Sequence, residues 1–81
     1  MRLLLSCNSS AGTFYIGQSS DGRFHPIYDG EDLGSYWSID QAIDDLCMNA
    51  TFSVLHSETG EMLDTSEIGL EEDPLDWSRM T

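Results

Sequence analysis

Up to residue 37, the pattern of apolar and polar positions is that of short β-strands. Two runs rich in β-branched and aromatic residues, 13–18 and 24–28, flank a polar segment that contains Asp21-Gly22. Such runs bounded by turn residues are typical of strands, and an Asp-Gly pair between them favours a tight hairpin. Pro26 cannot donate to a ladder, so we expect its strand to lie at a sheet edge or to contain a bulge. The leucines at 3–5 predict a short first strand or a docked terminus.

A further short strand is predicted for 33–37, after which the pattern changes to that of a helix. Ser38 followed by Gln41 has the spacing of a capping box, and Asn49 marks the expected helix end. Between them the apolar residues recur at i, i+3, i+4 and i+7, which gives one stripe suited to packing on a sheet. The stripe consists of Ile39, Ala42, Ile43 and Leu46.

The C-terminal part predicts a second hairpin, a connection and a short helical turn. Residues 51–56 and 62–64 are the expected strands, and an acidic connection follows them. Asp73-Pro74 then resembles a helix start, so we predict a helical turn over 75–79 that buries Trp77. The chain, 1–81, is therefore predicted to be one α+β domain. Its architecture is a small antiparallel sheet of about three to five strands with one main helix packed on it.

The charge of the chain narrows the kind of partner that it can bind. There are fifteen Asp and Glu residues, three Arg and no Lys, giving a formal net charge of −12. Fourteen of the acids lie between Arg23 and Arg79, where no Lys or Arg occurs. Self-repulsion of this size opposes folding and exceeds what solubility requires. It excludes direct nucleic-acid binding, because phosphates would be repelled, and it favours a basic partner.

The predicted helix concentrates this charge. Asp40 and Asp44 are one turn apart, where like charges destabilise a helix, and Asp44 and Asp45 approach the negative end of its dipole. One interpretation is an ordinary solvated face, but such faces intersperse both signs and this one does not. Carboxylates a helical turn apart, or two residues apart on a strand, follow one another at roughly 5–7 Å. Because a nucleic-acid strand repeats its phosphates on that scale, the hypothesis is mimicry of a polyanion.

An aromatic residue is expected beside these acids. Tyr36 and Trp37 are adjacent, so on a strand they face opposite ways, and an exposed aromatic there is a plausible interface anchor. The predicted partner-binding residues are Tyr36 together with acids from the turn, the helix and the C-terminal part. They are Asp29, Glu31, Asp32, Tyr36, Asp40, Asp44, Asp45, Glu67, Glu71, Glu72, Asp73 and Asp76.

Other kinds of site have little support. The segment 29–34 places oxygen ligands near glycines but lacks the spacing of an EF-hand loop. His25, His56, Cys7 and Cys47 show no paired zinc spacing. For nucleophilic catalysis the chain offers Cys47 with His25 or His56, and no recognisable nucleophile turn. We therefore expect no enzyme, no metal and no cofactor.

The first residues bear on location. Their Leu-Leu-Ser-Cys sequence is similar to the end of a lipoprotein signal, with Cys7 as the acylated residue. A secretory signal needs an apolar stretch of roughly 7–15 residues, and here there are three leucines. No stretch is long enough for a transmembrane helix. We expect a cytoplasmic protein with reduced cysteines, no membrane contact and a monomeric state.

Most of the chain resembles a group of short bacterial and prophage proteins to which no activity is attached. The resemblance is carried by 14–16, 22–26, 29–36, 42–46 and 76–77. In its small size, its acidity and its similarity to prophage proteins, the chain also resembles the small phage-encoded anti-CRISPR proteins, especially those acting on type I systems as DNA mimics. That second likeness is one of class and transfers no motif residue. It implies a protein of the bacterial host cytoplasm that binds the basic, DNA-facing groove of a Cascade-type complex and blocks target DNA.

Two functions from different classes stay open. The first is a DNA-mimic inhibitor of a type I CRISPR-Cas surveillance complex. The second is an acidic immunity or antitoxin-type protein that neutralises one basic nuclease or toxin. The first predicts charges that each contribute a little over an extended face, and the second predicts a compact epitope with one or two dominant residues.

Overall fold

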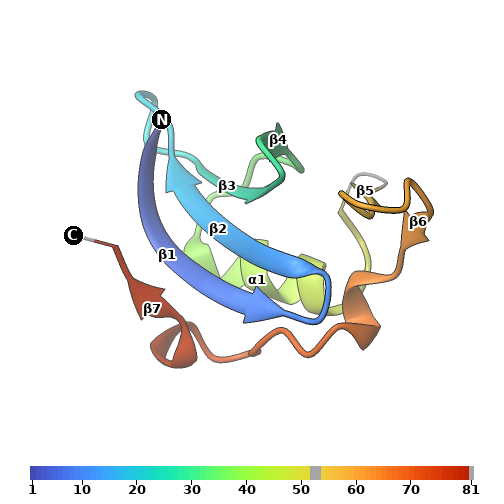
Figure 1. Ribbon diagram of the computed structural model, residues 1–81. Coiled ribbons are helices and arrows are strands. Elements are labelled where there is room, and N and C mark those ends of the chain that lie inside the picture. The colour runs from blue at the N-terminus through green and yellow to red at the C-terminus, as the bar shows by residue number, and fades with distance from the viewer. Residues whose placement is uncertain (52–53, 81) are drawn as a thin grey trace.

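The computed structural model describes residues 1–51 and 54–80. Five strands form an antiparallel sheet in the order β4-β3-β2-β1-β7, with the main helix α1 (Ile39–Cys47) across one face (Figure 1). This arrangement confirms the predicted α+β fold. The strands are β1 (Arg2–Ser9), β2 (Gly12–Gln18), β3 (Phe24–Tyr28), β4 (Glu31–Asp32) and β7 (Ser78–Arg79).

Turn chemistry explains the hairpins of this sheet. The Ser19 N–H donates to the Arg23 carbonyl at 2.9 Å and Gly22 has φ +85°, so the predicted turn before β3 is confirmed. Asp29 and Gly30 join β3 to β4 with φ values of +52° and +77°. Positive φ at both central residues is the geometry of a two-residue type I′ turn, whose twist matches that of the flanking strands.

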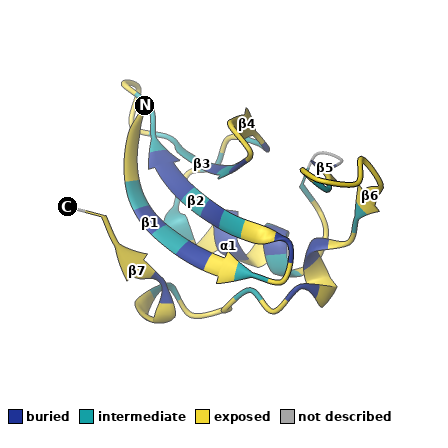
Figure 2. Cartoon of the chain, in the orientation of Figure 1, coloured by how far each residue is buried: buried dark blue, intermediate teal, exposed yellow. Residues whose placement is uncertain are grey.

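The helix begins and ends close to the predicted residues. Ser38 Oγ accepts a hydrogen bond from the Gln41 N–H at 3.2 Å, which confirms the N-cap. Asn49, with φ +56°, lies just beyond the C-cap and turns the chain away. The apolar stripe faces the sheet and lies in the core (Figure 2). Its fully buried members are Ala42, Ile43 and Leu46.

The core between the sheet and α1 centres on β2. Phe14 and Ile16 are fully buried there, and the Phe14 ring stacks on Tyr28 with centroids 4.5 Å apart. The predicted first strand is confirmed as β1, although only Leu5 of its leucines is buried and Leu3 is exposed. Alternating burial along β1 and β2 is what a sheet covered on one face requires.

A second, two-stranded sheet, β5 (Val54–Leu55) with β6 (Met62–Leu63), projects beyond the main sheet (Figure 1). It confirms a hairpin here, while residues 52 and 53 of the predicted strand lie outside the described residues. The Tyr28 hydroxyl connects this hairpin to the main sheet. It donates to the Ala11 carbonyl at 2.8 Å and accepts from the Ser57 N–H of the hairpin at 3.1 Å.

The edge position predicted for Pro26 is wrong, because β3 pairs with both β2 and β4. The β2–β3 ladder passes through Pro26 without a shift in register. The Pro26 carbonyl accepts from the Leu33 N–H at 2.8 Å, on the β4 side. In an antiparallel strand the nitrogen and the carbonyl oxygen of one residue point to the same side. The Pro26 nitrogen, which has no hydrogen to donate, therefore also faces the β4 side. It lies beyond the last residue of β4, so no hydrogen bond of the ladder is lost.

The strand predicted for 33–37 is also wrong. The ladder residues are Glu31–Asp32. Beyond them, Leu33 adds a hydrogen bond to Pro26 and Tyr36 forms an isolated bridge with Phe24, without a continuous strand between. Gly34, with φ +151°, turns the backbone out of a regular strand between these two contacts.

The helical turn predicted for 75–79 is shorter than expected. The chain forms the 3-10 turns η1 (Thr65–Glu67) and η2 (Pro74–Asp76), and it then enters β7. The Asp73 cap and the burial of Trp77 are confirmed. β7 was missed because its two residues carry no pattern of their own and pair only where the folded sheet offers the free edge of β1. Within the described part of the chain, no helix has the length and apolar character needed to cross a membrane.

Candidate functional site

One side of α1 forms the wall of a hollow of about 370 Å³. Four lining residues recur at i, i+3, i+4 and i+7 along the helix, so their side chains lie one above another. Most of them are exposed, in contrast to the apolar stripe that faces the sheet. The fifth lining residue comes from the segment that leads into the helix. The lining consists of Tyr36, Gln41, Asp44, Asp45 and Met48.

Backbone contacts position Tyr36 at this hollow. Its N–H donates to the Phe24 carbonyl at 2.8 Å and its carbonyl accepts from the Phe24 N–H at 2.9 Å. Gly34 leaves room for the ring, because a Cβ at that position would stand 2.9 Å from Tyr36 Cε2. The aromatic wall of the hollow is therefore set by the sheet and not by the helix.

Tyr36 and Asp45 interact directly. Burial, the hydrogen bond to Asp45 and the negative charge of Asp45 together raise the pKa of Tyr36 to about 12. The phenol therefore remains protonated at neutral pH and donates to the carboxylate. This bond orients Asp45 toward the ring and leaves the Asp44 carboxylate exposed beside it.

The tyrosine titration tests this contact. We expect Tyr36 to ionise at about pH 12. Asp45→Asn is expected to lower the pKa of Tyr36 toward the ordinary tyrosine value, because the substitution removes the negative charge. The folded pKa is raised above the unfolded value of 10.0, so the stability from the neutral phenol is complete below pH 10 and is lost as pH rises through about 12. Tyrosinate absorbance against pH measures the step, and Tyr36→Phe assigns it. An identical titration curve for Asp45→Asn would contradict the contact.

Further carboxylates adjoin α1 near Cys47. The Cys47 Sγ faces the carbonyls of Leu70 at 4.0 Å and Glu71 at 3.8 Å, so the 70–72 segment lies against the end of the helix. Burial raises the pKa of the Cys47 thiol, and the negative charges of Glu72, Asp44 and Glu71 raise it further. These three carboxylates therefore share one electrostatic environment. We call Tyr36, Asp44, Asp45, Glu71 and Glu72 the acidic helix surface.

Little within the protein neutralises this charge. Among the described residues the one close contact between a basic side chain and a carboxylate joins His25 Nδ1 to Asp32 Oδ2 at 2.9 Å. The Arg23 guanidinium instead lies 3.9 Å from the centre of the Trp37 ring. Arg2 and Arg79 are exposed and form no ion pair with the described carboxylates. The described basic side chains therefore leave the charge of the acidic helix surface uncompensated.

The other predicted site residues occupy separate elements. Asp29 and Glu31 are exposed on the β3–β4 hairpin, and the Asp32 carboxylate accepts from the Gly34 N–H at 3.0 Å while pairing with His25. Since β4 and β7 are opposite edges of the sheet, these acids lie far along it from the C-terminal ones. The remaining four predicted residues are exposed on separate elements. Asp40 lies on α1 and Glu67 on η1, Asp73 caps η2, and Asp76 is the last residue of η2.

The structure adds residues that sequence analysis missed. Gln41 and Met48 line the hollow, and the available signal was that each lies three and four positions from the two aspartates along the helix. Of the aromatic pair, Trp37 is the exposed member at 73%, whereas Tyr36 is half-buried. The exposed aromatic is thus Trp37, which stacks with the Arg23 guanidinium, whereas Tyr36 is a wall of the hollow.

The chemistry of this surface suits an organic cation. Two carboxylates, an amide and a phenol supply acceptors, and Met48 offers an apolar contact to a methylene stem. A lysine or arginine side chain has this combination of charge and stem. In the part of the chain that the structure describes, no three His, Cys, Asp or Glu side chains are placed to hold a metal ion, and both cysteines are free.

A serine, a histidine and an aspartate also line up near the β2–β3 turn. His25 Nε2 lies 3.0 Å from Ser19 Oγ and its Nδ1 lies beside Asp32. However, the Ser19 hydroxyl donates its single proton to the Asp21 carboxylate, and this bond lowers the pKa of Asp21. The Ser19 hydroxyl proton is therefore directed to Asp21 and not to His25 Nε2, which would have to receive it if Ser19 were a nucleophile. The arrangement braces two turns.

Comparison with family models, with curated proteins and with solved structures finds no match to this chain. Function therefore has to be inferred from the chain's own residues.

Proposed function

We propose that this protein is a non-enzymatic inhibitor that binds the basic DNA-binding surface of a type I CRISPR-Cas surveillance complex and blocks target DNA. The observation that carries the proposal is the set of exposed carboxylates with almost no internal ion pairs. An anionic surface of this kind attracts a basic groove over a distance set by the ionic strength. The partner is a Cascade-type protein subunit in the bacterial cytoplasm, without direct nucleic-acid contact, cofactor or membrane.

The acidic helix surface supplies the contacts that long-range attraction alone lacks. A lysine or arginine that binds phosphate in the partner would enter the hollow beside Asp44 and Asp45, with its stem against Met48. Charge-assisted hydrogen bonds are about twice as strong as neutral ones. Glu71 and Glu72 extend the same charge beyond the helix, in the manner of successive phosphates.

A second candidate is favoured by a compact hollow and by an exposed tryptophan that follows Tyr36 in the sequence. An acidic immunity or antitoxin-type protein binds one basic nuclease through a few dominant residues. Trp37, 73% exposed, would be the anchor in that complex. In this case Trp37→Ala alone abolishes binding, whereas an extended mimic loses only a part of its affinity.

Electrophoretic mobility of target duplex with purified type I surveillance complexes tests the first function. The protein, added before the DNA, is expected to remove the shifted band. Asp44→Asn with Asp45→Asn is expected to raise the concentration needed for half-inhibition about tenfold or more, because charge-assisted bonds in the hollow are lost.

The matched control is Glu58→Gln with Glu61→Gln, which removes the same charge from the exposed tip of the small hairpin. We expect it to change inhibition much less than the helix pair. Equal effects of the two variants would show that only total charge matters and would refute the site. Unchanged DNA binding across subtypes would refute DNA blocking, and capture of a basic nuclease sensitive to Trp37→Ala would then establish the second candidate.

A further inference from the structure

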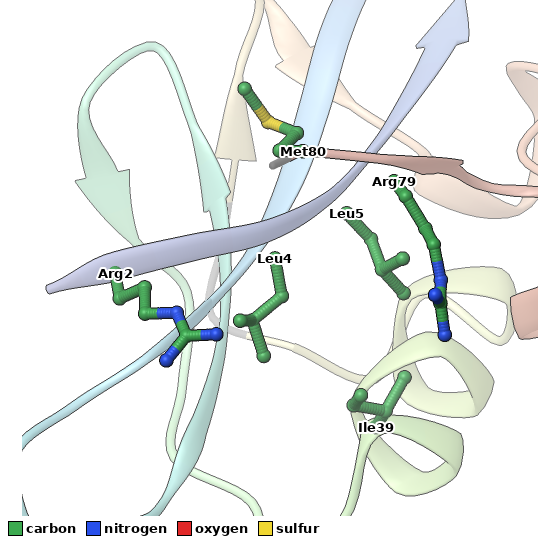
Figure 3. A pocket seen from close by; sticks show the side chains of 6 residues that line it. All are labelled: Arg2, Leu4, Leu5, Ile39, Arg79 and Met80. Atoms are coloured by element: carbon green, nitrogen blue, oxygen red, sulfur yellow. The ribbon is translucent and has the colours of Figure 1, made fainter.

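A groove of about 320 Å³ lies between the sheet and the start of α1, away from the hollow described above. Figure 3 shows Arg2, Leu4, Leu5 and Arg79 projecting toward the helix, where Ile39 faces them. Leu5 and Arg79 are ladder partners in β1 and β7, so their side chains share one face of the sheet. The groove is lined by Arg2, Leu4, Leu5, Ile39, Arg79 and Met80.

The groove combines an apolar floor with two cationic sides. Arg2 and Arg79 are two of only three basic Lys or Arg residues in the chain, and neither forms an ion pair with any of the fifteen carboxylates. Ile39 is the first residue of α1, so the positive end of the helix dipole also lies here. A matching occupant is an apolar group with carboxylates on either side.

The same chain carries such a group four residues before Arg79. Leu75 is 89% exposed, the largest exposure among the large hydrophobic residues described. It lies in η2 between Asp73 and Asp76, both exposed. The Asp73 carboxylate accepts from the Leu75 N–H at 2.9 Å, and the Asp76 N–H donates to the Asp73 carbonyl at 2.9 Å. The turn therefore presents its leucine in a fixed conformation, as an interface anchor requires.

The geometry points to a homodimer in which the Leu75 turn of each copy occupies the Arg2–Arg79 groove of the other. The charges of the two elements are complementary. Among the described residues neither Arg2 nor Arg79 forms an ion pair, and Leu75 is exposed. Since η2 ends shortly before β7, a two-fold axis beside β7 would allow both contacts at once, and this interface closes on itself. A free amphipathic anion would suit the groove but would leave Leu75 exposed. This inference is independent of the proposed function and differs from the monomer expected from the sequence.

The overall charge modulates this association. Each copy carries −12, so general repulsion opposes the dimer. Between 0.01 and 0.15 M salt the Debye length falls from about 30 Å to about 8 Å, which screens distant repulsion more than contacts inside the interface. We expect the dimer to strengthen over this range.

Sedimentation velocity of the full chain at increasing concentration and salt tests the inference. The wild type is expected to form a dimer, and Leu75→Ala to raise the dimer dissociation constant about tenfold or more. Because Leu75 is exposed, Leu75→Ala is not expected to unfold the chain, and circular dichroism checks this.

A charge exchange makes the test specific. Variant one carries Arg2→Glu and Arg79→Glu, and variant two carries Asp73→Asn and Asp76→Arg, where asparagine preserves the helix cap. Each alone is expected to be monomeric, because groove and turn then have the same sign. Their mixture is expected to form a heterodimer, since both contacts are then between opposite signs. Glu58→Arg with Glu61→Arg is the control and is expected to leave the dimer intact.

Three results would overturn the inference. The first is a wild-type monomer at the highest soluble concentration in every salt condition. The second is a dimer that forms equally well in each single variant, which would place the interface elsewhere. The third is binding of decanoate, used as an amphipathic carboxylate probe, that depends on Arg2 and Arg79 while the protein remains monomeric, which would assign the groove to a small ligand.

Discussion

Phe14→Ala is expected to lower the free energy of unfolding by about 3–5 kcal/mol. Phe14 has no exposed surface, and its ring stacks on Tyr28 across the β2–β3 ladder at 4.5 Å between centroids. Truncation removes this contact and leaves a cavity between the sheet and α1. Because small domains are stable by only about 5–15 kcal/mol, the loss is a large share of the total.

Denaturant unfolding followed by far-ultraviolet circular dichroism measures this effect. Phe14→Leu is the control and is expected to cost clearly less, since it refills most of the volume. Thr13→Ala on the same strand removes a half-buried side chain and is expected to cost about 1 kcal/mol or less. If Phe14→Ala cost no more than Thr13→Ala, the placement of the core between β2 and α1 would be wrong.

Trp77→Ala is also expected to cost about 3–5 kcal/mol, and to release the C-terminal strand. Trp77 is 4% exposed, and its Nε1–H donates to the Glu71 carbonyl at 2.8 Å. The Trp77 ring therefore holds in place the segment that carries Glu71, and β7 begins at the residue after Trp77. Loss of the ring removes packing from both.

Hydrogen exchange distinguishes this local release from general destabilisation. The Met80 N–H donates to the Leu4 carbonyl at 2.9 Å, so its protection reports on the β7 edge. We expect Trp77→Ala to remove that protection under conditions where the β1–β2 amides stay protected. Trp77→Phe keeps most of the packing and loses the Nε1 bond with part of the indole volume, so it is expected to cost clearly less than Trp77→Ala. Retained Met80 protection in Trp77→Ala would contradict the anchoring role.

These two residues affect function differently. Phe14 lies in the core and is not one of the residues that line the hollow, so its truncation is expected to change binding mainly by unfolding the protein. Trp77 positions the backbone of Glu71, so Trp77→Ala is expected to weaken binding to a basic partner even in the folded fraction. Measuring inhibition at equal concentrations of folded protein separates the two effects.

Most of the regular structure was predictable because it depends on neighbouring residues. Asp21-Gly22 predicted the β2–β3 turn, and Ser38 with the helical period predicted α1. The errors occur where a few residues take their structure from distant ones. Ser78–Arg79 becomes a strand only beside β1, and Pro26 is tolerated in an interior strand only because β4 ends before it.

The candidate site divides in the same way. Asp44, Asp45 and Tyr36 were predicted from charge and residue type, and the structure places them around one hollow. Gln41 and Met48 were missed because helix spacing was applied to the apolar stripe and to the acids, and not to the uncharged residues beside those acids. The contact of Glu71 with the end of α1 joins residues far apart in the chain, and no local pattern indicates it.

The sequence by itself determined the hairpin turns, the helix with its buried stripe and the large negative charge, because turn geometry, helical period and ionisation depend on residue type over a few neighbouring positions. Only the tertiary structure decided which carboxylates lie together and that Arg2 and Arg79 flank one groove. It also decided that Trp37, and not Tyr36, faces solvent. The physical reason is that each of these features depends on the packing of the sheet, the helix and the C-terminal segment against one another, which brings together side chains from distant parts of the chain.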